Sequence, residues 1–129
     1  GTGDTQLTFS QEIKMDGAII VSTPQEVALL DVKRGIKMFD KLGVKILGLV
    51  DNMSFFTADD GKKYKIFGEG GVKKTAEEFQ KKFLGEIPIN PEVGKCGDEG
   101  KPIVEANPGH EISKLYLSMA NNIKSTYIN

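Results

Sequence analysis

The stretch Ala18-Ile-Ile-Val-Ser-Thr-Pro-Gln-Glu26 decides the fold class of this chain. Its first four residues favour β-structure and are apolar on both faces, and the run is too short for a helix. It therefore predicts a buried strand of a parallel sheet. Thr23 is suited to cap a helix, Pro24 to occupy its first position, and Glu26 to return the capping-box hydrogen bond. A buried strand that leads directly into a helix predicts an α/β unit.

The same alternation of strand and helix continues along the chain. Apolar residues at helical spacing extend the first helix to Leu42, and Gly43 is a natural stop. The later elements are expected in this order: a strand over 44–50, a helix from 68–71 to about Lys82, a strand over 83–89 that Pro88 ends, and an amphipathic helix containing Ile112 and Ile123. We therefore expect one α/β domain with a parallel sheet, flanking helices and right-handed crossovers.

Two segments carry no strong periodic pattern. Thr57-Ala-Asp-Asp-Gly61 predicts a tight turn between two short extended arms, in which Asp59 and Asp60 are solvated. The segment between Pro88 and the last helix contains Gly and Pro and is expected to be an irregular connection. Cys96 would lie in that connection as an incidental residue, and His110 would start the last helix.

Composition excludes several classes of partner. The 129 residues include 17 basic and 18 acidic side chains, so no electrostatic footprint for nucleic acid is visible. No apolar run reaches the ~20 residues that span a bilayer, and no signal peptide opens the chain. The single cysteine excludes an internal disulfide framework. These features favour a cytoplasmic protein without a membrane partner.

Three short segments contain residue types that suit nucleotide chemistry. Gly1-Thr-Gly-Asp4 would allow close approach to a phosphate, or would simply start a helix capped by Asp4 or Thr5. Asn52 follows a buried strand, where open α/β sheets bind ligands, and its amide matches the N6 and N7 edge of adenine; the alternative is an ordinary turn residue. Ile87-Pro-Ile89 either packs against a flat base or terminates a strand.

Five motifs occur in a fixed order along nearly the whole chain. They are Gly-Thr-Gly-Asp-Thr-Gln-Leu from Gly1, Ser-Thr-Pro-Gln-Glu-Val-Ala from Ser22, Asn-Met-Ser-Phe-Phe from Asn52, Ile-Phe-Gly-Glu-Gly-Gly from Ile66 and Gly-Glu-Ile-Pro-Ile from Gly85. Each motif alone is weak, but five in sequence make chance similarity improbable. With them the chain resembles the Mrp branch of the ParA/MinD-type P-loop ATPases.

This resemblance implies a P-loop NTPase-like sheet and a cytoplasmic ATPase that uses ATP and Mg and carries or assembles iron–sulfur clusters. It implies that Asn52 recognises adenine, that Pro88 and Ile89 belong to the adenine pocket, and that Gly1 and Asp4 lie near the γ-phosphate. No Gly-x-x-x-x-Gly-Lys-[Ser/Thr] loop occurs in the chain. We therefore expect residues 1–129 to be a partial ATPase domain, the C-terminal part of such a protein, without catalytic residues and inactive alone.

The cluster-binding motif of the family is absent. Mrp-type proteins usually have Cys-Pro-x-Cys after Asn-Met-Ser, whereas this chain has Phe56-Thr-Ala-Asp-Asp-Gly61. Because iron–sulfur clusters require thiolates, these residues do not support a cluster-bridging role, and no metal ligands are assigned.

The resemblance also bears on function and association. For the parent protein it favours ATP-dependent iron–sulfur delivery to apoprotein clients. A ParA/MinD-type positioning ATPase and a non-catalytic dimerisation module stay as alternatives. In the family fold the strand at 18–21 pairs with strands that this chain lacks, so we expect the open edge to make a homodimer or larger oligomer.

Overall fold

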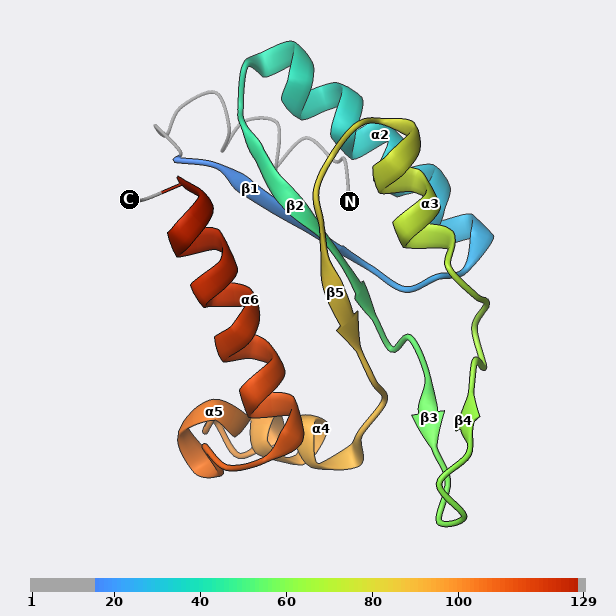
Figure 1. Cartoon of the computed structure of the whole chain (residues 1–129), viewed down its shortest axis with the longest axis vertical. Coiled ribbons are helices and arrows are strands. Elements are labelled where there is room, and N and C mark those ends of the chain that lie inside the picture. The colour runs from blue at the N-terminus through green and yellow to red at the C-terminus, as the bar shows by residue number, and fades with distance from the viewer. Residues whose placement is uncertain (1–15, 128–129) are drawn as a thin grey trace.

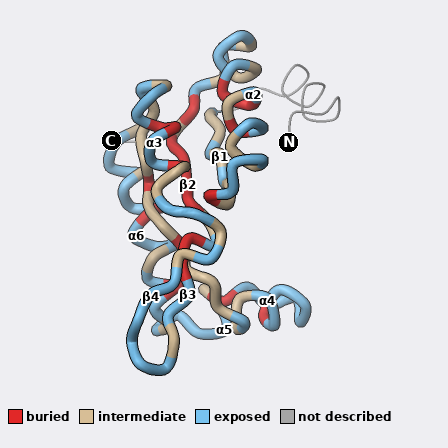
Figure 2. Tube along the Cα trace, turned by 90° about the vertical axis from the view of Figure 1, so that its right-hand side faces the viewer, coloured by how far each residue is buried: buried red, intermediate tan, exposed pale blue. Residues whose placement is uncertain are grey.

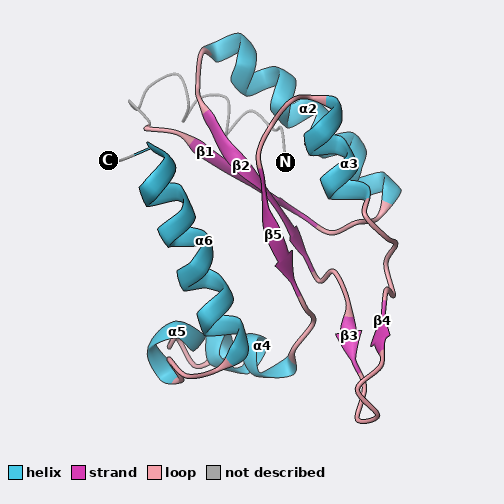
Figure 3. Ribbon diagram, in the orientation of Figure 1, coloured by secondary structure: helices cyan, strands magenta, loops and turns pink. Residues whose placement is uncertain are grey.

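The computed structural model describes residues 16–127. Within that range a parallel sheet is formed by β1 (Ala18–Ser22), β2 (Ile46–Asn52) and β5 (Phe83–Ile87), in the order β1-β2-β5. Helices α2 (Glu26–Leu42) and α3 (Gly71–Glu78) cover one face, and α6 (Glu111–Tyr127) covers the other (Figures 1 and 3). The expected α/β class and parallel sheet are confirmed.

The central strand β2 is the most buried element and separates two apolar clusters (Figure 2). Successive side chains of a strand point to opposite faces. Leu49 accordingly packs with residues of α2 and α3, and Val50 packs with β5, α4 and α6. The first cluster comprises Val32, Ile36, Ile46, Leu49, Val72 and Ala76, and the second Val50, Leu84, Ile87, Cys96, Ile103, Ile112 and Met119.

The ends of α2 agree only in part with the sequence prediction. Gly43 adopts the left-handed conformation with φ 71° and stops the helix, as expected. The capping box is wrong, because the N-cap is Gln25 and it makes no side-chain capping bond. Thr23 lies two residues before this N-cap, and its hydroxyl lies 3.2 Å from Oε1 of Gln25.

The segment after β5 is helical rather than irregular. It contains α4 (Pro91–Asp98) and the short α5 (Ile103–Ala106). The side chain of Asn90 caps α4 by accepting from the Glu92 N–H at 2.9 Å, and Pro91 occupies the first helical position. Cys96 is buried in this helix. Gly94 and Gly97 weaken the helical signal of the sequence, which is why the prediction missed the helix.

Two other boundaries differ by a few residues. α3 ends at Glu78 rather than near Lys82, because Gln80 has φ 57° and interrupts the helical path. β5 ends at Ile87, one residue before Pro88. Within β5, Gly85 has φ 147°, and a Cβ there would lie 2.9 Å from Cε of Met119. Glycine therefore allows α6 to pack closely on the sheet.

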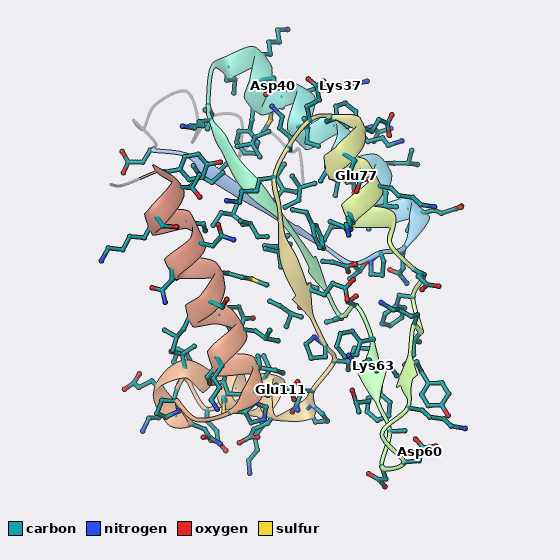
Figure 4. All side chains as sticks on the ribbon, in the orientation of Figure 1. Lys37, Asp40, Asp60, Lys63, Glu77 and Glu111 are labelled. Carbon is teal, nitrogen blue, oxygen red and sulfur yellow. The ribbon has the colours of Figure 1, made fainter. Side chains whose placement is uncertain are left out.

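The expected turn between two extended arms is present. β3 (Phe56–Thr57) pairs with β4 (Lys63–Tyr64) as an antiparallel hairpin that projects from the body of the fold (Figure 1). Asp60 lies at its tip, where Oδ1 accepts the N–H of Lys62 at 2.9 Å (Figure 4). Across residues 16–127, no helix is both long and apolar enough to cross a bilayer.

Candidate functional site

The carboxyl ends of β2 and β5 meet at one edge of the sheet. Asn52 and Ile87 are the last residues of these strands and lie opposite each other in register. Beyond them the Ser54 N–H donates to the Ile87 carbonyl at 3.0 Å, and the Ile89 N–H donates to the Phe55 carbonyl at 2.7 Å. The segments that follow the two strands are therefore held together, as expected for a ligand site at the end of a parallel sheet.

A cavity of about 320 Å³ lies between α6 and the face of the sheet that this helix covers. It extends from Ile19 and Val21 of β1 to Asn52 at the carboxyl end of β2. Asn52 and Ile87 line it from the sheet, and Tyr116 and Met119 line it from α6. The lining is mostly apolar, with the Asn52 amide as a polar group. Its size falls in the lower range of small-molecule pockets, about 300–1,000 Å³. Met53, directly after Asn52, has φ 55°, a strained conformation for a residue with a side chain.

The structure brings some of the predicted site residues together. Asn52 lines the cavity, whereas Pro88 and Ile89 are half-buried just beyond it and Ile87 takes the lining position. Gly1 and Asp4 lie outside the described residues. The sequence analysis named the whole segment Ile87-Pro-Ile89, and the resemblance narrowed the expected base contact to Pro88 and Ile89; of the three residues, Ile87 is the one on the cavity wall.

Asp51 is a second polar residue at this edge that the sequence analysis did not single out. It is 1% exposed, and neither carboxylate oxygen has a hydrogen-bond partner among residues 16–127. Burial, followed by the nearby carboxylate of Glu86, raises the pKa of Asp51 to about 6, against opposing effects of Ser54 and Lys65. The sequence signal that could have identified Asp51 is an acidic residue directly after the apolar residues of β2.

Residues 16–127 contain no group of three or more His, Cys, Asp or Glu placed to hold a metal ion. His110 lies at the start of α6, as expected, where Nδ1 accepts the Ile112 N–H at 3.1 Å. The polar groups at the carboxyl end of β2 are the amide of Asn52 and the buried carboxyl of Asp51.

Comparisons with known proteins give relatives in sequence and in structure. The chain is 46% identical over 121 residues to the iron-sulfur cluster carrier protein of Aquifex aeolicus. The aligned region covers 93% of this chain and 33% of that protein. Among solved structures, the nucleotide-binding protein of Archaeoglobus fulgidus in complex with ADP matches with a TM-score of 0.69 and 39% identity, over 78% of this chain and 42% of that one. The MinD cell division protein of Aquifex aeolicus matches with a TM-score of 0.71 over 98% of this chain and 50% of that one, but at 19% identity, which shows the fold alone.

The chain spans 33–40% of the length of the first curated relatives that it matches. The ParA family model, described as NUBPL iron-transfer P-loop NTPase, matches residues 1–124. Because this match includes nearly all of the 129 residues, the chain belongs to the NUBPL iron-transfer P-loop NTPase family of ParA proteins.

Proposed function

We propose that this chain supplies the adenine-binding side of the nucleotide site in an ATP-dependent iron–sulfur cluster carrier. The observation that carries the proposal is the position of Asn52, at the carboxyl end of β2 and on the wall of an apolar cavity. The relatives named as iron-sulfur cluster carriers, and the ADP complex of the Archaeoglobus fulgidus protein, support it.

The chemistry of the cavity suits a purine base. The Asn52 amide offers one donor group and one acceptor, which complement N6 and N7 of adenine. Ile87 and Met119 offer apolar surface to the flat face of the base. The backbone bonds of Ser54 and Ile89 hold these groups in place before a ligand arrives.

The remaining roles belong to the same proposal. Gly1 and Asp4 would lie toward the phosphates, and Pro88 and Ile89 would close the base pocket from the side. The phosphate-binding loop and the site of Mg would come from other parts of the protein, since no Walker-type loop occurs in the sequence. Iron–sulfur apoproteins would be the clients, and a cytoplasmic location follows from the same resemblance.

Association of two copies is also proposed. Within residues 16–127, β1 pairs only with β2, and the exposed side chains of Ile19 and Val21 lie along it. An open strand edge with apolar side chains is a template for pairing with another strand. A two-fold contact at β1 would cover this edge.

An NMR titration tests the adenine proposal. A polypeptide of these 129 residues is titrated with AMP and with CMP, and the side-chain and backbone amides of Asn52 are followed. We expect millimolar or weaker affinity for AMP, because most phosphate contacts are missing, and no saturable shift with CMP. Asn52→Ala should weaken AMP binding about 10-fold, the cost of losing a bidentate base contact of about 1–3 kcal/mol.

The matched control is Asn121→Ala, the same change at an exposed position of α6. It should leave AMP binding unchanged. Equal shifts with AMP and CMP, or equal affinity in the Asn52 variant and the wild type, would contradict the proposal.

A further inference from the structure

A second cavity, of about 570 Å³, lies between α4, α5 and the N-terminal part of α6. These elements gather at one end of the fold (Figure 1). Val93 and Gly97 line the cavity from α4, Ile103 lines it from α5, and Tyr116 lines it from α6. Its lining is almost entirely apolar. Tyr116 also lines the cavity that contains Asn52, so the two cavities adjoin, but they have no other lining residue in common.

Two glycines of α4 are not required by the packing of the described residues. Gly94 and Gly97 lie within an eight-residue helix, where glycine is less favourable than alanine. Neither has a positive φ, and a Cβ at either position would meet nothing within 4 Å. Gly97 lies on the cavity wall, whereas Gly94 does not. A glycine on a cavity wall that the fold itself does not need leaves room for another molecule to approach the backbone.

The surface around this cavity is acidic. Asp98, Glu99 and Glu105 are exposed and are direct sequence neighbours of residues that line the cavity. None of the three has an ion-pair partner among residues 16–127. Residues 91–111 contain five acidic and two basic side chains, a formal charge of −3 with His110 neutral, whereas the whole chain has −1. Lys101, which lines the cavity, is one of those two basic side chains, so the surface retains a potential that attracts cations.

An apolar cavity within an acidic surface is complementary to one kind of partner. A large apolar side chain would fill the cavity and leave water, and lysine or arginine side chains beside it would meet the acidic rim. An uncharged or acidic segment would gain only the first of these contacts. A phosphate group would be repelled, which distinguishes this surface from a nucleotide site.

We propose that the surface around Gly97 binds a segment of a partner protein in which a large apolar side chain is flanked by lysine or arginine residues. The apolar side chain lies in the cavity against Ile103 and Tyr116, close to the backbone of Gly97. Its basic neighbours pair with Asp98 and Glu99. This interaction does not depend on the proposed nucleotide binding, because only Tyr116 belongs to both cavities.

Defined peptides test this surface. Three blocked hexapeptides are titrated into the 129-residue chain: Leu-Phe between two pairs of lysines, Leu-Phe between two pairs of glutamates, and Ser-Ser between two pairs of lysines. The amides of Gly97, Gly100 and Ile103 are followed by NMR. The lysine peptide with Leu-Phe should give saturable shifts with a Kd of about 1 mM. Raising the salt from about 20 mM to about 300 mM should weaken its binding about 10-fold. The other two peptides should not saturate these amides.

Gly97→Leu and Gly94→Leu separate binding from stability. Both replace a helical glycine with a strong helix former, so both should raise the Tm by about 2–5 °C. Gly97→Leu fills part of the cavity and should weaken binding of the Leu-Phe lysine peptide by a factor of about 10. Gly94→Leu is the matched control, since position 94 does not line the cavity, and it should bind as the wild type. A purely structural role of Gly97 would not combine a higher Tm with weaker binding.

A charge variant keeps the test decisive if Gly97→Leu disturbs α4. Glu99→Lys leaves the cavity unchanged and should weaken the Leu-Phe lysine peptide while strengthening the glutamate peptide. Asp59→Lys changes an exposed acidic residue of the β3–β4 hairpin to lysine and should alter neither affinity. Equal binding of the lysine and glutamate peptides, equal weakening by Gly94→Leu and Gly97→Leu, or saturable shifts of Gly97 with AMP but not with the Leu-Phe lysine peptide would overturn the proposal.

Discussion

The imidazole of His110 links two helices of the fold, because its Nε2 lies 3.0 Å from Oε2 of Glu92 in α4 while its Nδ1 accepts the Ile112 N–H. The second contact satisfies one of the unpaired N–H groups at the start of α6. His110 is thus a helix cap with a tether to α4.

We expect His110→Ala to lower the free energy of unfolding by about 1–2 kcal/mol, most of it from the lost cap. Glu92 is partly exposed, so Glu92→Gln should cost only a few tenths of a kcal/mol. His110→Asn should recover most of the loss, since Asn is a good cap. Urea denaturation of the three variants measures these differences, and equal destabilisation by Ala and Asn would count against the capping role.

Asp51→Asn should stabilise the folded chain at neutral pH. The pKa of Asp51 is raised by burial to about 6 from 3.8, so the folded state binds more protons than the unfolded state between these values. Wild-type stability therefore falls as pH rises from about 4 to about 6 and then levels off. The shift corresponds to about 2–3 kcal/mol at most.

This stability difference has a defined pH window. Asp51→Asn should exceed the wild type above pH 6 and approach it near pH 4, whereas Asp59→Asn should match the wild type throughout. Denaturation curves at pH 4, 5, 6 and 7 give the comparison. A constant offset between Asp51→Asn and the wild type at every pH would show that the effect does not arise from titration.

The sequence predicted those parts of the fold whose signals are local and strong. Gly43 and the turn around Asp60 each formed the element expected from them. The apolar run at 18–21 formed a strand of the parallel sheet, but the expectation that this strand is buried is wrong, because β1 is the last strand in the order β1-β2-β5 and its side chains alternate between half-buried and exposed. α4 was missed because its glycines lower helical propensity, and its Cys96 packs in a cluster with residues of the sheet, α5 and α6 that no local pattern reveals.

The sequence singled out one of the two polar residues that end β2 and not the other. Asn52 was found from its place after a buried strand, and the structure puts it on a cavity wall. Asp51 was not found, because its significance depends on its burial in the folded chain and on the register that sets it beside Glu86. Long-range pairing of this kind is invisible in the sequence of one chain.

Cys96 illustrates how burial changes an expectation. The sequence suggests that Cys96 is an incidental residue of an irregular connection, but Cys96 is 6% exposed and packs in the cluster with Ile103 and Ile112. A serine hydroxyl in that apolar setting should destabilise the fold by about 1–2 kcal/mol. Cys96→Ala, measured beside it, separates the loss of volume from the burial of a polar group.

A polypeptide of these 129 residues should not bridge an iron–sulfur cluster. Each copy has one cysteine, and that thiol is buried, so a dimer would offer two inaccessible thiolates where a cubane cluster needs four ligands. Anaerobic reconstitution should yield no stoichiometric charge-transfer absorption. A stable cluster that is lost in Cys96→Ser would reverse this expectation.

Association at β1 provides the last prediction. Val21 is 57% exposed on a strand that, within the described residues, has no partner on its outer edge. Because unpaired N–H and C=O groups and apolar side chains favour strand pairing, light scattering at micromolar concentration should report at least twice the 14.1 kDa of one chain. A specific contact should bury more than ~1,000 Å² in total.

Val21→Lys places a charge on the outer edge of β1 and should restore the monomer, because lysine on natural edge strands prevents pairing with another strand. Val27→Lys is the matched control, since Val27 is 71% exposed on α2, away from the edge, and its variant should remain associated. A monomeric wild type, or equal dissociation by both lysine variants, would show that β1 is not the contact.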